Sequence, residues 1–132
     1  MSQKYLKFHE VNFGYESACE PLFKGVSLQL SNGWTGIVGA NGSGKTTFLK
    51  LATGMLMPDS GKISTPSRAV YCRQRTDDPP EQYAALIESQ SKAASIIRGR
   101  FGLAPEWLQR WATLAHGERN RAHIGAALWL DP

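Results

Sequence analysis

The chain has 132 residues, of which 42% are hydrophobic and 20% charged, which is typical of a soluble globular protein with one core. No apolar run approaches the ~20 residues that span a bilayer, and the N-terminal MSQKY lacks the apolar core of a secretory signal, so no direct membrane insertion is expected. The net charge of +4 fits either a solvated surface or an acidic partner such as RNA. Cys19 and Cys72 have no CxxC spacing, so we expect reduced thiols in a cytoplasmic protein.

The first third of the chain predicts β-structure. Residues 5–13 and 22–30 are alternating or apolar segments, separated by a turn-like segment at 14–17. A turn at 31–33 leads into the short apolar run 34–38, which we interpret as a buried strand.

A glycine-rich segment follows that strand. It consists of Gly39, Ala40, Asn41, Gly42, Ser43, Gly44, Lys45, Thr46 and Thr47, and it matches the phosphate-binding loop pattern GxxxxGK[ST], also called Walker A. The glycines let backbone N–H groups point at phosphate oxygens. Lys45 is expected to bridge the β- and γ-phosphates and Thr46 to bind Mg²⁺. A glycine-rich turn that contains a lysine by chance is the alternative, but the predicted strand before the loop and the apolar helical spacing after it favour the phosphate site.

The rest of the chain predicts two short strands and then helices. A turn at 58–61 precedes strands at 62–65 and 69–72, and the segment 77–80 opens an α-rich stretch with one or two amphipathic helices. Pro105 is expected in the first turn of a helix that runs through Trp107 and Trp111, whose rings pack a small core rather than stack on a nucleotide. The helix at 117–130 is apolar nearly all round beyond Ala122 and must be buried.

Together with the loop, these features resemble the N-terminal part of an ATP-binding cassette (ABC) ATPase domain. The resemblance implies ATP and Mg²⁺ as cofactors. Tyr15 matches an aromatic residue that stacks on adenine in that family, although an exposed turn tyrosine is the alternative. Gln74, which follows the predicted strand at 69–72, matches a glutamine that contacts Mg²⁺.

A third element resembles the family's signature motif, usually Leu-Ser-Gly-Gly-Gln or -Glu. Here it consists of Leu114, Ala115, His116, Gly117 and Glu118. The resemblance implies that this helix start caps the γ-phosphate bound by a second cassette, in cis or in trans, and an ordinary helix start is the alternative. Ala115 lacks the hydroxyl and His116 adds bulk, so we expect weaker capping than at a standard signature.

The resemblance implies an α/β fold: an incomplete P-loop NTPase cassette of the ABC type, with an antiparallel β segment, a parallel core sheet and a small helical subdomain. We divide it into a nucleotide-binding core at 1–75, a helical subdomain at 76–113 and the signature with its helix at 114–132. Asp131 is expected to close that helix, and the strand with the metal-binding aspartate is expected after Pro132. We therefore assign no catalytic residue and expect the 132-residue chain to bind nucleotide with negligible hydrolysis.

The expected role is an ATPase module that moves a partner. Glu118-Arg119 and the short stretch between Gln74 and Leu114 resemble the tandem-cassette ABC-F branch, which acts on ribosomes. The alternatives are a nucleotide-binding subunit of a membrane transporter and a nucleotide-binding fragment without catalysis.

Overall fold

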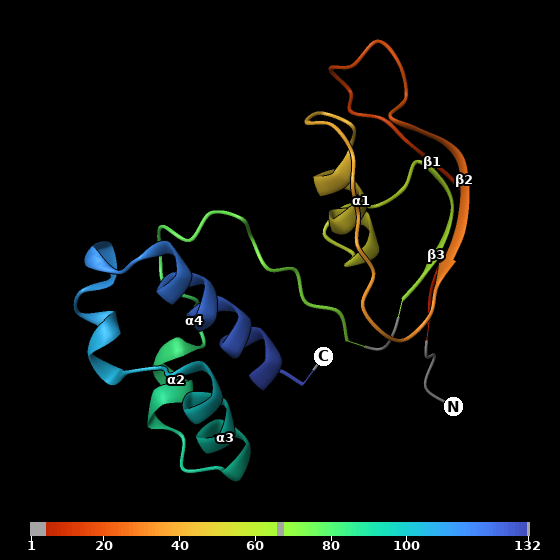
Figure 1. Cartoon of the computed structure of the whole chain (residues 1–132). Coiled ribbons are helices and arrows are strands. Elements are labelled where there is room, and N and C mark those ends of the chain that lie inside the picture. The colour runs from red at the N-terminus through yellow and green to blue at the C-terminus, as the bar shows by residue number, and fades with distance from the viewer. Residues whose placement is uncertain (1–4, 66–67, 132) are drawn as a thin grey trace. The chain divides into compact units, whose positions relative to one another are not determined.

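The computed structural model describes residues 5–65 and 68–131, and the chain divides into two compact units, residues 1–71 and 72–132. In the first unit, strands β1 (Leu6–Phe13), β2 (Phe23–Leu30) and β3 (Ser60–Ser64) form an antiparallel sheet in the order β2-β1-β3. Helix α1 (Lys45–Ala52) packs on this sheet (Figure 1). The predicted strands at 5–13, 22–30 and 62–65 and the loop helix are therefore confirmed.

A β-bulge at Glu10 gives the central strand its buried face. Phe8, Val11 and Phe13 are all buried, although a strict two-residue period would place Phe8 opposite the other two. The pairing register shifts after Phe8, and Glu10 has φ +49°, so one extra residue returns the later side chains to the core face. Gly61 lies against this bulge, where a Cβ would sit 2.2 Å from the Glu10 carbonyl oxygen.

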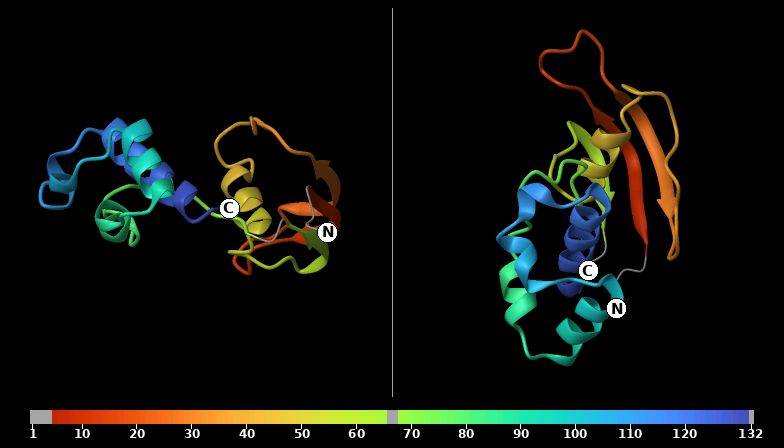
Figure 2. Two further views of the ribbon diagram at one scale, coloured as in Figure 1. Left: turned by 90° about the horizontal axis from the view of Figure 1, so that it is seen from below. Right: turned by 60° about the vertical axis from the view of Figure 1, so that its left-hand side comes forward.

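This face of the sheet forms a core with α1. Leu51 and Ala52 of the helix are buried together with the three β1 side chains, and the ring of Phe48 stacks on Phe8 with centroids 4.8 Å apart. Both views of Figure 2 show α1 beside the strands. The start of α1, and with it the phosphate loop, is thereby held by apolar packing against β1.

Two predicted strands are wrong within the described residues. Residues 34–38 and 69–72 form no strand, and Trp34 and Val38 are 105% and 93% exposed. A buried parallel strand needs hydrogen-bonded neighbours and covered faces, whereas the described sheet contains only the antiparallel strands β1 to β3. Backbone N–H and C=O groups that have no neighbouring strand must bond to water instead, so these two segments stay accessible to solvent. The expected parallel core sheet is thus absent from the described residues.

The second unit is helical. It contains α2 (Tyr83–Glu88), α3 (Lys92–Phe101), the 3₁₀ helices η1 (Pro105–Leu108) and η2 (Trp111–Thr113), and α4 (His116–Trp129). The Ser91 hydroxyl accepts a hydrogen bond from the Ala94 N–H at 3.1 Å and caps α3, and Gly102 ends this helix at φ +61°. Two amphipathic helices are therefore confirmed, and α3 begins and ends at residues suited to a cap.

The two tryptophans pack a core, as predicted, but not on one helix. Trp107 and Trp111 are buried with Tyr83, whose ring is parallel to that of Trp107 at 6.4 Å and edge-on to Trp111 at 6.2 Å. The chain forms two separate 3₁₀ turns here instead of the expected single helix. Such short turns let both large rings face the same core.

Helix α4 is only partly buried. Ala122, Gly125 and Ala126 face the core, and a Cβ on Gly125 would lie 3.1 Å from Leu103. The helix is therefore buried against the core on one face, as expected, whereas Ile124 and Leu128 are 44% and 48% exposed. Among the described residues, none of the helices combines the length and apolarity required for crossing a membrane.

Candidate functional site: a phosphate loop on helix α1

The segment at 39–47 forms a tight loop that leads into α1. The Ser43 N–H donates to the Ala40 carbonyl at 3.1 Å, and the Phe48 N–H donates to the Gly44 carbonyl at 2.8 Å. Gly42 and Gly44 have φ values of +84° and +101°, a backbone conformation that residues other than glycine rarely adopt. The glycine positions of the motif are therefore required by the conformation of the loop.

The start of α1 is suited to an anion. A helix leaves its first N–H groups without intrahelical partners, and no side chain caps Gly44 and no acidic residue occupies the first turn. The partial positive charge of the helix terminus adds to these donors. A phosphate group would supply the acceptors that this helix start lacks.

Lys45 brings a full positive charge to the same place. Its Nζ donates hydrogen bonds to the carbonyl oxygens of Gly39 and Ala40, the latter at 3.2 Å. These two bonds hold the ammonium group over the first residues of the loop. A triphosphate at this point would meet the ammonium and the helix start together, so the loop fits the group that its sequence motif predicts.

Thr46 and Thr47 differ in their surroundings. Thr46 is exposed at the start of α1, where a hydroxyl oxygen is a ligand type that Mg²⁺ accepts beside phosphate oxygens and water. Thr47 is 6% exposed, and its Oγ1 lies 2.8 Å from the hydroxyl of Tyr15. This contact between residues 32 positions apart has no signal in the sequence, because neither residue type nor spacing predicts it.

Gln74 and the signature residues belong to the second unit, whereas the loop and Tyr15 belong to the first. Gln74 is exposed and follows no strand, unlike the strand context that we expected for it. Leu114 is buried, and α4 begins directly after Ala115. Glu118 accepts a hydrogen bond from the Ala115 N–H at 2.9 Å. His116 and Gly117 are exposed on the first turn, and no heavy atom lies within 4 Å of a Cβ built on Gly117.

Sequence reasoning missed one set of contacts around the segment after Gln74. The Trp111 Nε1–H donates to the Thr76 carbonyl at 3.0 Å, and His123 Nε2 lies 3.0 Å from the Asp78 carbonyl. The rings of Trp111 and His123 also meet edge-on, at 5.7 Å. These two side chains fix the segment 76–78 to the helical unit.

The described fold and loop define the class of protein: a nucleotide-binding domain of the phosphate-loop type. The model of the ABC transporter family matches residues 23–132, and the chain belongs to that family, in which ATP is the bound nucleotide. The predicted family and its α/β cassette fold are thereby confirmed.

Three comparisons show the extent of the similarity. The ABC transporter ATP-binding protein ARB1 of Saccharomyces cerevisiae is 32% identical over 96% of this chain, which covers 23% of that protein. The phosphonates import ATP-binding protein PhnC 1 of Natronomonas pharaonis is 30% identical over 81% of the chain, which covers 58% of it. CbiO1 of Clostridium perfringens, part of the CbiONQ transporter complex, superposes with a TM-score of 0.68 at 24% identity, over 98% of this chain and 63% of its own. The chain thus spans only part of each.

Proposed function

We propose that residues 39–47 bind the phosphates of ATP with Mg²⁺, and that this binding drives a partner protein in transport. The observation that carries the proposal is the position of the Lys45 ammonium group, held by two loop carbonyls at the uncapped start of α1. Membership of the ABC transporter family supports ATP as the nucleotide.

Each residue has a distinct part in this proposal. Lys45 and the N–H groups at the start of α1 bind and orient the β- and γ-phosphates. Thr46 would offer its hydroxyl to Mg²⁺, and the family resemblance alone assigns Gln74 a contact with this ion. When bound, Mg²⁺-ATP supplies the phosphoanhydride whose binding and cleavage do the work, and the signature at 114–118 contributes to the site of a second cassette.

A membrane-spanning transporter subunit is the partner that we propose. Two similar proteins are named for transport, PhnC 1 as a phosphonates import ATP-binding protein and CbiO1 as part of a transporter complex. This favours the transporter alternative over the ribosomal role expected first. The proposal places the chain in the cytoplasm, beside its membrane partner.

An ABC-F-type role on the ribosome is the second candidate. One observation favours it: Leu114 to Arg119 read Leu-Ala-His-Gly-Glu-Arg, a signature variant that resembles that branch. A cassette that co-purifies with ribosomes in an ATP-dependent manner, and not with membranes, would replace the transporter proposal.

The Lys45→Ala variant tests nucleotide binding. Removing a charge-assisted contact to phosphate, worth about 1.5–3 kcal/mol, predicts ATP binding weaker by about tenfold to a hundredfold in calorimetry. Lys50→Ala is the matched control, because Lys50 lies in the last turn of the same helix and outside the loop. Equal affinities of wild type and Lys45→Ala for Mg²⁺-ATP would contradict the proposal.

A further inference from the structure

We propose that the face of the antiparallel sheet that points away from α1 binds single-stranded nucleic acid. The surface consists of Tyr5, Lys7 and His9 along β1, Gln29 on β2 and Lys62 on β3, and we call it the outer sheet face. This inference goes beyond the proposed function, because the surface lies on the strands rather than on the phosphate loop and its ligand is a polymer rather than ATP.

Alternation along β1 places two flat rings and a cation on the outer sheet face. Phe8 is buried against α1, and its neighbours Lys7 and His9 are exposed on the other side of the strand. Tyr5, which precedes the strand, continues this alternation and is 40% exposed. Residues two apart in a strand lie about 7 Å from one another. Tyr5 and His9 therefore flank Lys7 in a row of three.

The neighbouring strands add a second cation and a hydrogen-bonding amide. The pairing register places Lys62 of β3 opposite His9, and Gln29 of β2 opposite Lys7. Lys7 and Lys62 are thus diagonal neighbours, which in an antiparallel sheet lie about 7–8 Å apart. Both are exposed, and among the residues that the structure describes neither ammonium group forms an ion pair or a hydrogen bond. Two unneutralised cations side by side favour an anionic partner.

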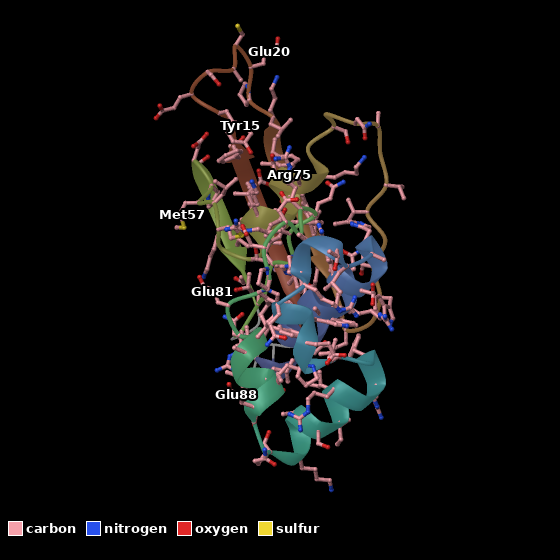
Figure 3. The ribbon with its side chains drawn as sticks, turned by 90° about the vertical axis from the view of Figure 1, so that its left-hand side faces the viewer. Tyr15, Glu20, Met57, Arg75, Glu81 and Glu88 are labelled. Atoms are coloured by element: carbon pink, nitrogen blue, oxygen red, sulfur yellow. The ribbon has the colours of Figure 1, made fainter. Side chains whose placement is uncertain are left out.

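Most acidic residues of this unit lie at the other end of the sheet. Glu16 and Glu20 belong to the loop that joins β1 to β2, which follows the end of β1 remote from Tyr5, and Figure 3 shows Glu20 at the tip of this loop. Asp59 is occupied beside the same loop, where its Oδ2 accepts a hydrogen bond from the Gly14 N–H at 3.0 Å. Positive and negative groups are therefore separated along the strands.

Glu10 is the acidic residue within β1, and its carboxylate is turned away from Lys62. The Ser27 hydroxyl of β2 donates to Glu10 Oε1 at 3.3 Å, and Oε2 lies 3.6 Å from a Cβ built on Gly25 of the same strand. Because β2 and β3 lie on opposite sides of β1, this carboxylate is directed towards β2 and Lys62 remains on the β3 side. The outer sheet face thus keeps its positive charge next to the bulge.

A single strand of nucleic acid offers both kinds of group that this surface matches. Its phosphates pair with ammonium groups, and its unstacked bases stack on tyrosine and histidine rings. The amide of Gln29 can bond to a base edge or to a phosphate oxygen. A duplex keeps its bases stacked on one another, and an anionic membrane has phosphates but no planar rings. The two rings beside Lys7 therefore favour a single strand over either.

Fluorescence anisotropy with a labelled oligouridylate of about twelve nucleotides, within the range of single-strand site sizes, tests the inference on the whole chain. Tyr5→Ala and His9→Ala are each expected to weaken binding about fivefold or more, the effect of one stacked base, whereas Tyr5→Phe keeps the ring and should bind like the wild type. Lys7→Ala and Lys62→Ala should each reduce the slope of log affinity against log salt by about 0.7. Lys92→Ala, at the exposed start of α3, is the charge-matched control and should change neither quantity.

The same variants separate this surface from the phosphate loop. All four alanine variants on the outer sheet face are expected to keep the wild-type affinity for Mg²⁺-ATP, and excess Mg²⁺-ATP should leave the oligouridylate bound. Oligouridylate binding that ATP abolishes and these variants leave unchanged would assign the RNA to the loop and overturn the inference. A chain that binds oligouridylate but no ATP would overturn the proposed function alone.

Three further outcomes would overturn the inference. The first is a wild-type chain that does not bind the oligouridylate at low salt. The second is wild-type affinity in Tyr5→Ala, or an equal loss in Lys92→Ala, because general charge would then account for the binding. The third is wild-type binding to phosphatidylserine vesicles that Lys7→Ala and Lys62→Ala abolish, without binding to oligouridylate, which would assign the surface to a membrane.

Discussion

The carboxylate of Glu118 accepts a hydrogen bond from the backbone N–H of Ala115 at 2.9 Å, and Ala115 has no hydroxyl with which to return one to the helix. In a complete capping box, a serine or threonine at the first position accepts from the N–H three residues later. Helix α4 therefore begins with half of a capping box, in the middle of the signature.

Ala115→Ser is expected to complete the box and raise the free energy of unfolding by about 1 kcal/mol. It is also expected to strengthen ATP-driven dimerisation in an intact protein, because in the proposed composite site the hydroxyl is a further donor to the γ-phosphate. Denaturation without nucleotide measures the first effect, and sedimentation with ATP the second. Ala85→Ser, on an exposed position of α2, is the control and should give neither gain. Stabilisation without tighter dimers would assign the hydroxyl to the helix alone.

Gly44→Ala is expected to weaken ATP binding by more than about tenfold, because the residue has φ +101° and strain in this region costs on the order of 1–3 kcal/mol. The added Cβ would also lie 3.1 Å from Leu22 and 3.2 Å from Phe23. Gly99→Ala is the matched control: it lies inside α3 with open space around it, and should stabilise the chain by up to about 1 kcal/mol. Calorimetry with Mg²⁺-ATP compares the two, and unchanged binding in Gly44→Ala would show that the loop tolerates a side chain.

The sequence predicted correctly those elements that are stabilised by interactions between residues close together in the sequence. The loop motif is one example, since Gly42, Gly44 and Lys45 act within a few residues. The strand expected at 34–38 is different, because a parallel strand exists only through neighbours that are remote in sequence. The apolar residues at 34–38 do not show whether neighbouring strands are present to pair with this segment.

Two contacts between residues remote in sequence were also beyond sequence reasoning. Tyr15 meets Thr47, and Trp111 meets Thr76, each across more than thirty residues. The β-bulge at Glu10 could not be predicted from the sequence either, although it determines which side chains of β1 pack against α1. Such features depend on how elements pack rather than on the period of one segment.

Tyr83 makes the stability of the helical unit sensitive to alkaline pH. Burial is the main cause that raises the pKa of its hydroxyl to about 12, and the nearby Glu106 carboxylate adds to this rise. The Tyr83 O–H donates a hydrogen bond to the Ala104 carbonyl at 2.8 Å. Because the folded pKa lies above the unfolded value of about 10, the contribution is complete below pH 10 and is lost as the pH rises towards 12.

The comparison of wild type with Tyr83→Phe isolates this effect. At pH 7 the variant is expected to be less stable by about 1 kcal/mol, since it loses the hydrogen bond to Ala104. The difference should shrink between pH 10 and pH 12 in denaturant titrations, because only the wild type has this group to ionise on unfolding. A difference that stays constant over this range would show that Tyr83 has an ordinary pKa.

His123→Ala is expected to release the segment that follows Gln74. The imidazole lies 3.0 Å from the Asp78 carbonyl and packs edge-on against Trp111, so its loss removes one hydrogen bond and one ring contact. A loss of about 1 kcal/mol from local stability corresponds to about fivefold more frequent opening. Limited trypsin digestion should therefore cut after Arg75 several times faster, while α4 keeps its circular dichroism signal. Gln109→Ala, at an exposed position between η1 and η2, serves as the control, and equal cleavage rates in both variants would show that Trp111 alone holds the segment.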